Sequence, residues 1–225
     1  MIKFGLITEG VSDQEVIENI LTGYFNNDDL TMYVNPLQPL RDATDEESIK
    51  KFGNWYKVFE YCKSNYFKEA FQRNDYLIIQ IDTDVCNEKH YDVKDTRPDG
   101  TKKTPPELIK DVKLKFKEVI GNELYDKHKE RIIFAICVNA IECWLLPIYY
   151  SDKTKEKTNN CLYKLNNKLK YKINPEAKNP DLYDDISRKY CKHQELLKLY
   201  KKNPSLKIFI EELMSKKIKF EEEDI

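Results

Sequence analysis

The apolar run from Leu77 to Ile81, followed at once by two aspartates, limits what this chain can fold into more than any other feature. Its sequence, Leu-Ile-Ile-Gln-Ile, is typical of a strand buried on both faces. Asp82 and Asp84 come next, and side chains two apart on an extended chain point the same way. Because two close carboxylates repel each other unless a proton or a cation lies between them, the pair indicates a site for a hard cation such as Mg²⁺. The alternative is a polar turn that ends the strand.

Strand-like and helix-like segments alternate along the first two thirds of the chain. Short apolar runs are separated by stretches whose apolar residues recur at helical spacing. This order predicts an α/β fold over residues 1–150, with a mostly parallel sheet of about four strands, right-handed crossovers and flanking helices. The strands are expected at Lys3–Thr8, Leu30–Leu37, Leu77–Ile81 and Arg131–Val138, and the helices at residues 12–24, 52–71 and 105–121.

Boundary signals support these helices. Ser12 or Asp13 can cap the first helix, Pro105-Pro106 opens the last, and Gly121 ends it. Residues 41–50 are expected to be a charged connector. The middle helix has an aromatic stripe that is expected to pack in the core, formed by Phe52, Trp55, Tyr56, Phe59, Tyr66, Phe67 and Phe71.

Four acidic residues follow three of the predicted strands. Glu9 follows the first strand, Asp82 and Asp84 follow the third, and Glu142 comes shortly after the fourth. With the common 2-1-3-4 order, these acids meet beside a switch point, where open α/β sheets bind their ligands. Glu142 stands in an apolar setting, in which a carboxylate must be paired, protonated or bound to a metal. A structural salt bridge is therefore the alternative to a metal site at this residue.

A long polar stretch, residues 87–104, leaves the third strand beside the carboxylates. It contains a strong turn signal at residues 98–100, Pro-Asp-Gly, and a loop of this length in a compact domain is usually functional or mobile. Its cations, Lys89, Lys102 and Lys103 among them, are candidates for contact with a substrate phosphate. The alternative is a solvated surface loop.

The charge of the chain is divided unevenly. The 225 residues carry a net charge of −1, yet Lys153–Lys207 contains fifteen Lys or Arg and six Asp or Glu, a net charge of +9. Residues 151–225 are interpreted as a basic, mostly helical extension packed on the first domain, with a frayed acidic end at Glu221–Asp224. Tyrosines alternate with lysines there, which suits base stacking and phosphate neutralisation, with Lys168 and Lys170 as candidate contacts. Alternatively, these aromatic residues pack a small helical subdomain.

The composition also excludes several classes of protein. No apolar run has the roughly 18–20 residues of a membrane helix, and the apolar start at residues 1–7 is too short for a signal peptide and leads straight into a polar turn. The six cysteines form no CxxC pair, and the three histidines are scattered, which argues against zinc. We therefore expect reduced, mostly structural thiols in a cytoplasmic protein without a membrane segment.

Three short motifs resemble those of a known family. Residues 7–13, ITEGVSD, resemble the EGxxD-type first motif of Toprim domains, and residues 81–84, IDTD, resemble their DxD motif. Residues 140–144, AIECW, are similar to a downstream acidic motif of small Toprim-like proteins related to the overcoming-lysogenisation-defect nucleases. The resemblance covers about residues 1–150. The chain departs from the fuller DxDxxG form, because Val85-Cys86-Asn87 follows the second aspartate.

The resemblance implies a Rossmann-like sheet, bound Mg²⁺ or Mn²⁺, and phosphodiester chemistry on nucleic acid. It implies that Glu9 is an acid/base or metal-organising residue, that Asp82 and Asp84 are metal ligands, and that Asp13 and Glu142 are auxiliary acids near the metal. Related small Toprim proteins often act in phage defence beside a separately encoded ATPase, which makes such an ATPase a candidate partner.

Together these features predict a Mg²⁺- or Mn²⁺-dependent endonuclease of DNA or RNA, with Glu9, Asp82, Asp84 and Glu142 as its catalytic residues. One alternative is a metal-dependent glycosyltransferase, which also uses a DxD motif after a strand but gives Glu9 and Glu142 no role. The other is a non-catalytic Toprim-like module that only binds nucleic acid or a protein partner.

Overall fold

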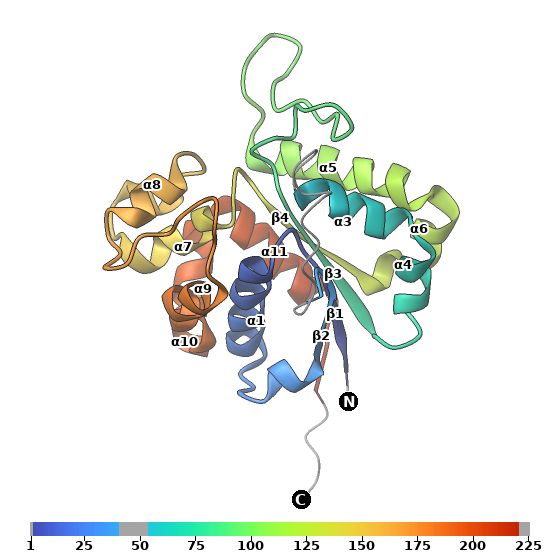
Figure 1. Cartoon of the computed structure of the whole chain (residues 1–225), viewed down its shortest axis with the longest axis horizontal. Coiled ribbons are helices and arrows are strands. Elements are labelled where there is room, and N and C mark those ends of the chain that lie inside the picture. The colour runs from blue at the N-terminus through green and yellow to red at the C-terminus, as the bar shows by residue number, and fades with distance from the viewer. Residues whose placement is uncertain (1, 41–53, 221–225) are drawn as a thin grey trace, which may run out of the picture.

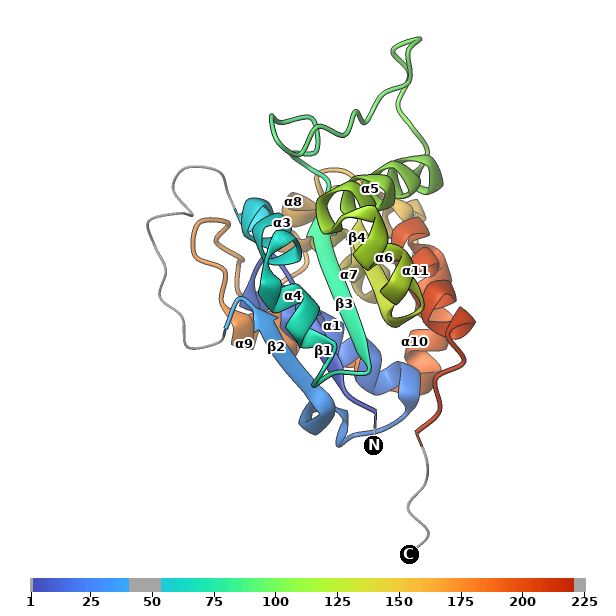
Figure 2. The ribbon, with the colours of Figure 1, turned by 90° about the vertical axis from the view of Figure 1, so that its right-hand side faces the viewer.

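The computed structural model describes residues 2–40 and 54–220, which form a three-layer α/β structure (Figures 1 and 2). Its one sheet has four strands, all parallel, in the order β2-β1-β3-β4. The strands are β1 (Phe4–Ile7), β2 (Val34–Gln38), β3 (Tyr76–Asp82) and β4 (Ile132–Cys137). The predicted fold class, a parallel sheet of about four strands with flanking helices, is confirmed, and so is the 2-1-3-4 order.

Burial explains the position of each strand. β3 lies between β1 and β4, and six of its seven residues are buried, as its unbroken apolar run predicts. β2 pairs only with β1 and is therefore an edge strand, where the missing N–H of Pro36 is tolerated. The predicted second strand begins too early, because Leu30–Tyr33 forms a 3₁₀ turn that buries Leu30 before the chain extends.

Helices cover both faces of the sheet (Figure 2). One hydrophobic core lies between the sheet, α1, α7 and the C-terminal helices, and a second lies between the sheet and α3, α4 and α5. No helix among the described residues is long and apolar enough to cross a membrane. The helices are α1 (Val11–Phe25), α3 (Asn54–Lys63), α4 (Asn65–Ala70), α5 (Pro105–Ile120), α6 (Asn122–His128), α7 (Glu142–Tyr149), α8 (Cys161–Asn166), α9 (Pro180–Ser187), α10 (His193–Leu199) and α11 (Pro204–Ser215).

Two of the predicted helix boundaries need correction. α1 begins at Val11 with Gly10 as its N-cap, so neither Ser12 nor Asp13 caps it. The predicted helix 52–71 is interrupted at Ser64 and forms α3 and α4. The start of α5 at Pro105 is confirmed. Phe52 of the aromatic stripe, the connector 41–50 and the acidic end at 221–224 lie outside the described residues.

The C-terminal segment shares its core with the sheet. Tyr183, Tyr190 and Tyr200 are buried in the same cluster as β1 and α1, which supports the packing alternative for these tyrosines, whereas Tyr163 and Tyr171 are exposed. α1 lies against this segment at Gly23, where a Cβ atom would stand 1.8 Å from the backbone oxygen of Tyr190. Helices α9 and α10 lie beside α1 in Figure 1.

One pair of cysteines contradicts the expectation of reduced thiols. Cys143, at the start of α7, forms a disulfide with Cys161, at the start of α8, 18 residues further along the chain. Both are buried, and they meet because α8 folds back onto α7, which no local spacing reveals. The free cysteines of the described chain are Cys62, Cys86, Cys137 and Cys191.

We expect Gly23→Ala to destabilise the protein by about 1–3 kcal/mol or more, because the new methyl group overlaps a backbone atom that cannot rotate away. Thermal and urea unfolding would measure the loss. Leu114→Ala, at an exposed position of α5, should change stability little. Wild-type stability of Gly23→Ala would show that α1 and the C-terminal segment do not pack as closely as described.

Candidate functional site at the carboxyl edge of the sheet

The ends of β1 and β3 are tied together by a short hydrogen-bond network. The backbone N–H of Asp82 donates to Glu9 Oε1 at 2.7 Å, and the backbone N–H of Glu9 donates to Gln80 Oε1 at 3.1 Å. Gln80 Nε2 in turn donates to Asp82 Oδ1 at 2.9 Å. The structure therefore places Glu9 and Asp82 side by side at the switch point between β1 and β3.

Two further acids and one lysine join this pair. Asp13 comes from the first turn of α1, and Glu142 begins α7; both are buried. Glu142 Oε1 accepts hydrogen bonds from Lys178 Nζ, at 2.8 Å, and from the Tyr183 hydroxyl. The salt bridge that was the alternative for Glu142 is thus present in the structure, with a partner from the C-terminal segment.

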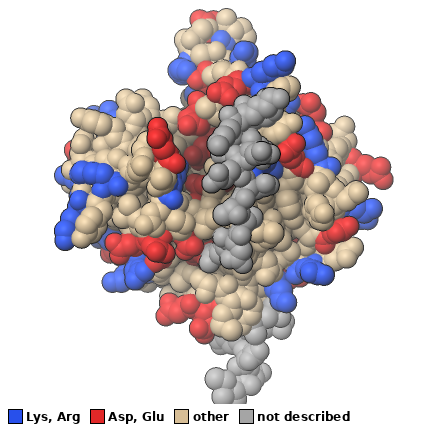
Figure 3. Space-filling view, in the orientation of Figure 1, with Lys and Arg blue, Asp and Glu red and all other residues tan. Residues whose placement is uncertain are grey.

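A cavity of about 390 Å³ lies beside these groups. Its walls include Glu9, Asp13, Asp82 and Lys178, together with Pro175–Ala177 and Pro180 from the segment around Lys178. Figure 3 shows acidic side chains in the hollow between the C-terminal helices on the left and the projecting loop at the top. Asp13 Oδ1 is buried and has no hydrogen-bond partner, so one strong acceptor in the cavity wall is unsatisfied.

Asp84 lies on the other side of the strand end. β3 stops at Asp82, so the alternation of side chains that places residues two apart on one face does not extend to Asp84. Asp84 is exposed and lines a second cavity of about 310 Å³, whose walls also include Lys102 and Lys103. The expectation that Asp82 and Asp84 project together is therefore not met, since the two carboxylates line different cavities.

Burial and mutual repulsion raise the pKa values of the acids that line the first cavity. Burial, with Asp13 and Asp84 nearby, raises the pKa of Glu9 to about 8. Burial is also the main cause that raises the pKa of Asp13 to about 6, and the pKa of Asp82 lies well above its usual range. Groups with such shifts cluster at functional sites, although structural clusters also produce them.

Glu142 and Lys178 behave as a charged pair. Burial alone would raise the pKa of Glu142, but the charge and the hydrogen bond of Lys178 outweigh it, and the pKa falls below its usual range. Burial would lower the pKa of Lys178, yet the charges of Glu142, Asp13 and Asp82 raise it above its usual range. Lys178 is therefore a permanent cation, and it offsets only part of the negative charge around the cavity.

The predicted substrate lysines have different environments. In the projecting loop (Figure 1), Lys102 forms an ion pair with Asp95, and Lys103 forms one with Asp111 at 2.6 Å. Lys89 is exposed and, unlike these two, lines neither cavity. The start of the loop is anchored, because the buried Tyr91 donates its hydroxyl to the backbone oxygen of Asp82 at 3.0 Å.

Lys168 and Lys170 lie outside both cavities as well. They follow α8, where Lys168 Nζ stands 5.0 Å from the ring centroid of Tyr150 and Lys170 Nζ stands 5.1 Å from that of Tyr171. Both residues are exposed. They remain candidates for contact with a longer nucleic acid that extends beyond the cavities.

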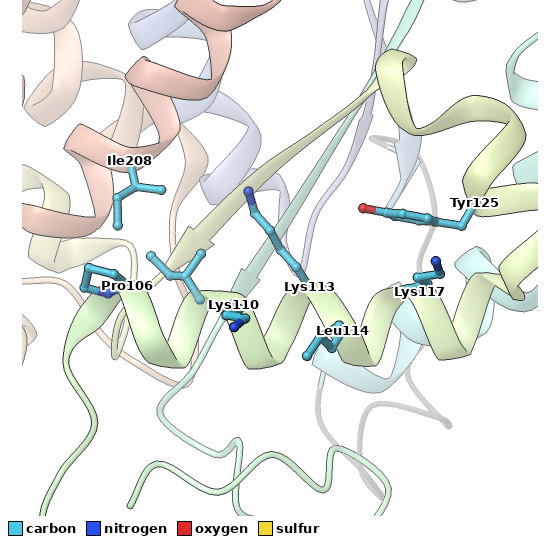
Figure 4. A pocket seen from close by; sticks show the side chains of 8 residues that line it. Pro106, Lys110, Lys113, Leu114, Lys117, Tyr125 and Ile208 are labelled. Atoms are coloured by element: carbon cyan, nitrogen blue, oxygen red, sulfur yellow. The ribbon is translucent and has the colours of Figure 1, made fainter. Parts of the chain in front are cut away.

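A third cavity, of about 370 Å³, lies between α5, α6 and α11 (Figure 4). Leu114, Tyr125 and Ile208 line it, and its lysines are largely engaged: Lys113 bonds Glu212 at 2.5 Å, and Lys117 bonds Asp126 at 3.1 Å. None of the acids at the carboxyl edge of the sheet lines this third cavity, so it is not the candidate active site.

Sequence reasoning missed three residues of the site. Gln80 was visible as the one polar residue in an apolar strand, but its role was not inferred. Lys178 and Tyr183 carry no motif and lie in the segment expected to be a basic extension packed on the first domain. No local signal identifies them, because only the packing of α9 against α1 and α7 brings them to Glu142.

The donor set has the chemistry of a hard-cation site. Carboxylate oxygens are the ligands that Mg²⁺ and Mn²⁺ prefer, and the unpartnered Asp13 Oδ1 is one such oxygen. As the side chains stand, no group of three His, Cys, Asp or Glu in the described parts of the chain could hold a metal ion. Lys178 supplies the positive charge there. Metal binding by Glu9, Asp13 and Asp82 therefore stays a prediction, and so does the role of Asp84 as a ligand.

We expect the stability of the protein in chelator to fall as the pH rises from 4.5 to 8, the interval between the ordinary and the raised pKa of Glu9. In this interval the folded state holds a proton that the unfolded state has released, so raising the pH favours unfolding. Urea unfolding across this range would measure the slope. Glu9→Gln should flatten it, and Glu123→Gln, at an exposed position of α6, should not. Equal slopes for all three proteins would contradict the raised pKa of Glu9.

Searches against protein-family models, curated proteins and solved structures found no match to this chain. What the protein does therefore has to be argued from its own residues. These provide a parallel sheet with a switch point between β1 and β3, a cavity lined by Glu9, Asp13 and Asp82, and a lysine in the same wall that is bound to the buried Glu142.

Proposed function

We propose that this protein is a metal-dependent nuclease that hydrolyses phosphodiester bonds in DNA or RNA. The observation that carries the proposal is the meeting of Glu9, Asp13 and Asp82 in the wall of one cavity, with the buried Glu142 close enough for its charge to act on Asp82, although these acids come from three separate segments. Buried carboxylates without matching positive charge are costly, and a fold keeps them where a bound cation makes use of them. The resemblance of the motifs to Toprim nucleases supports the same function.

Each group has a role in this proposal. Glu9, Asp13 and Asp82 hold the divalent cation, which when bound would polarise the phosphate and activate a water molecule. Asp84 faces the substrate on the neighbouring side of the strand end. Lys178 stays protonated and stabilises the negative charge that develops on the phosphate oxygens, while Glu142 and Tyr183 position it.

The glycosyltransferase alternative receives less support from the geometry. It requires Asp82 and Asp84 to hold one metal together, whereas they line different cavities. It also assigns nothing to Glu9, Asp13 or Glu142. An ATPase partner and an effector role in phage defence are implied by the family resemblance alone and stay predictions.

The second candidate is a non-catalytic Toprim-like module that binds nucleic acid. The observation that favours it is Lys178, whose Nζ lies 2.8 Å from Glu142 Oε1 and supplies a fixed positive charge where a catalytic metal would be needed. In this alternative the lysine replaces the metal permanently.

Asp82→Asn is expected to reduce cleavage at least about 100-fold while preserving the fold, because it removes a metal-binding charge from a cavity wall. Labelled single-stranded and duplex DNA and RNA, with Mg²⁺ or Mn²⁺ and with chelator, would serve as substrates. Asp185→Asn, an exposed aspartate of α9, is the matched control. Full metal-dependent activity of Asp82→Asn would show that Asp82 is not a metal ligand, and a wild-type protein without cleavage under all conditions would favour the non-catalytic module.

The Lys178→Met variant provides a second test that separates the metal-dependent nuclease from the non-catalytic module. If the lysine shares the cavity with a metal, its removal eliminates a competing cation, and Mn²⁺ should bind more tightly by calorimetry while cleavage falls. Lys189→Met, in the turn after α9, is the control, since its ion pair with Glu195 lies outside the cavity. Absence of Mn²⁺ binding in both wild type and Lys178→Met would argue for the module without a metal.

A further inference from the structure

The second cavity, of about 310 Å³, adjoins the proposed catalytic centre through the Asp82-Thr83-Asp84 segment. Thr83 and Asp84 line it, and their backbone N–H groups both donate to the backbone oxygen of Asn139, at 2.9 and 3.0 Å. Asn139 returns its own N–H to Thr83 Oγ1 at 2.8 Å. The Thr83 N–H also lies 3.1 Å from the backbone oxygen of Cys137, so the wall between the two cavities is held by four hydrogen bonds between the ends of β3 and β4.

Besides charged side chains of both signs, the walls of this cavity contain apolar and uncharged polar groups. Leu108, from α5, and Val138, after β4, are apolar. Asn139, Thr158 and Asn159 provide amide and hydroxyl groups, which can donate or accept hydrogen bonds. An apolar surface beside such groups is what a flat heterocyclic base requires, because its faces are apolar and its edges carry donors and acceptors.

Positive charge lies at the same cavity. Lys102 and Lys103 line it, and each is held by a carboxylate, Asp95 for Lys102 and Asp111 for Lys103. Lys103 Nζ also donates to the backbone oxygen of Lys94 at 2.6 Å. Because an ammonium group has three donors, each lysine still has at least one donor for a phosphate oxygen. The apolar and amide-bearing walls and the two lysines thus belong to one cavity, which is next to Asp82.

We propose that this cavity binds one nucleotide of a single-stranded DNA or RNA, beside the phosphate that the Asp82 cluster receives. The inference rests on the proposed nuclease function and names the substrate of that site. The cavity volume is that of a small-molecule pocket and not of a groove for a duplex. Bases in a duplex are stacked and paired and must be flipped out before an enclosed pocket can take them, whereas the bases of a single strand are accessible.

Fluorescence anisotropy tests the proposal. The protein is the Asp82→Asn variant, chosen because its cleavage should be strongly reduced. The ligands are labelled octanucleotides of single-stranded DNA and RNA and the duplex DNA of the same sequence. A single strand should bind about tenfold more tightly than the duplex. When Thr158→Val and Asn159→Ala are introduced together into the Asp82→Asn protein, single-strand binding should weaken about tenfold and duplex binding should stay unchanged. Asn167→Ala, at an exposed position after α8, is the matched control, and circular dichroism checks the fold.

Two results would overturn the proposal: a duplex that binds as tightly as both single strands, or single-strand binding that the Thr158 and Asn159 changes leave intact. Cleavage by the wild-type protein is measured separately. Single-strand binding that depends on Thr158 and Asn159, together with no cleavage, would support the nucleotide site while rejecting the proposed nuclease. Cleavage together with equal binding of duplex and single strand would support the proposed nuclease while rejecting the nucleotide site.

Discussion

The burial of carboxylates at the ends of β1 and β3 is the constraint on which the rest of this structure depends. Asp82 is only 6 % exposed, and its side chain lies among other acids in the wall of the first cavity. The Gln80 and Glu9 hydrogen bonds satisfy part of the polar groups there, but they cannot remove the repulsion between the acids. Protons, the ammonium group of Lys178 or a bound cation must do so, and this requirement links stability to whatever occupies the cavity.

That requirement also explains why the C-terminal segment is part of the site. Lys178 and Tyr183 both bond to Glu142, and α9 brings them there by packing on α1. Close packing of α1 with this segment needs Gly23, so a backbone contact in the core determines where a charged group lies at the sheet edge. A split of the chain at residue 150, drawn from charge and composition, separates residues that share one hydrophobic core and one cavity.

The features that the sequence predicts are those that depend on residues close together along the chain. The apolar runs and their spacing predicted the strands, because burial on both faces leaves its mark in consecutive residues. The strand order then placed Glu9 beside Asp82 correctly. Lys178 could not be found this way, since its role arises from a contact with Glu142 between distant segments. The Cys143–Cys161 disulfide was missed for the same reason.

The spacing of a DxD motif is informative only as far as the strand continues. Inside β3, residues two apart face the same side, but the strand ends at Asp82, and Thr83 and Asp84 turn toward Asn139. The two aspartates therefore serve different cavities, one crowded with acids and the other lined by lysines and amides. Under the proposed function, this one short segment would hold the reacting phosphate on one side and the adjoining nucleotide on the other. The hydrogen bonds of Asn139 would then fix the distance between the two binding sites.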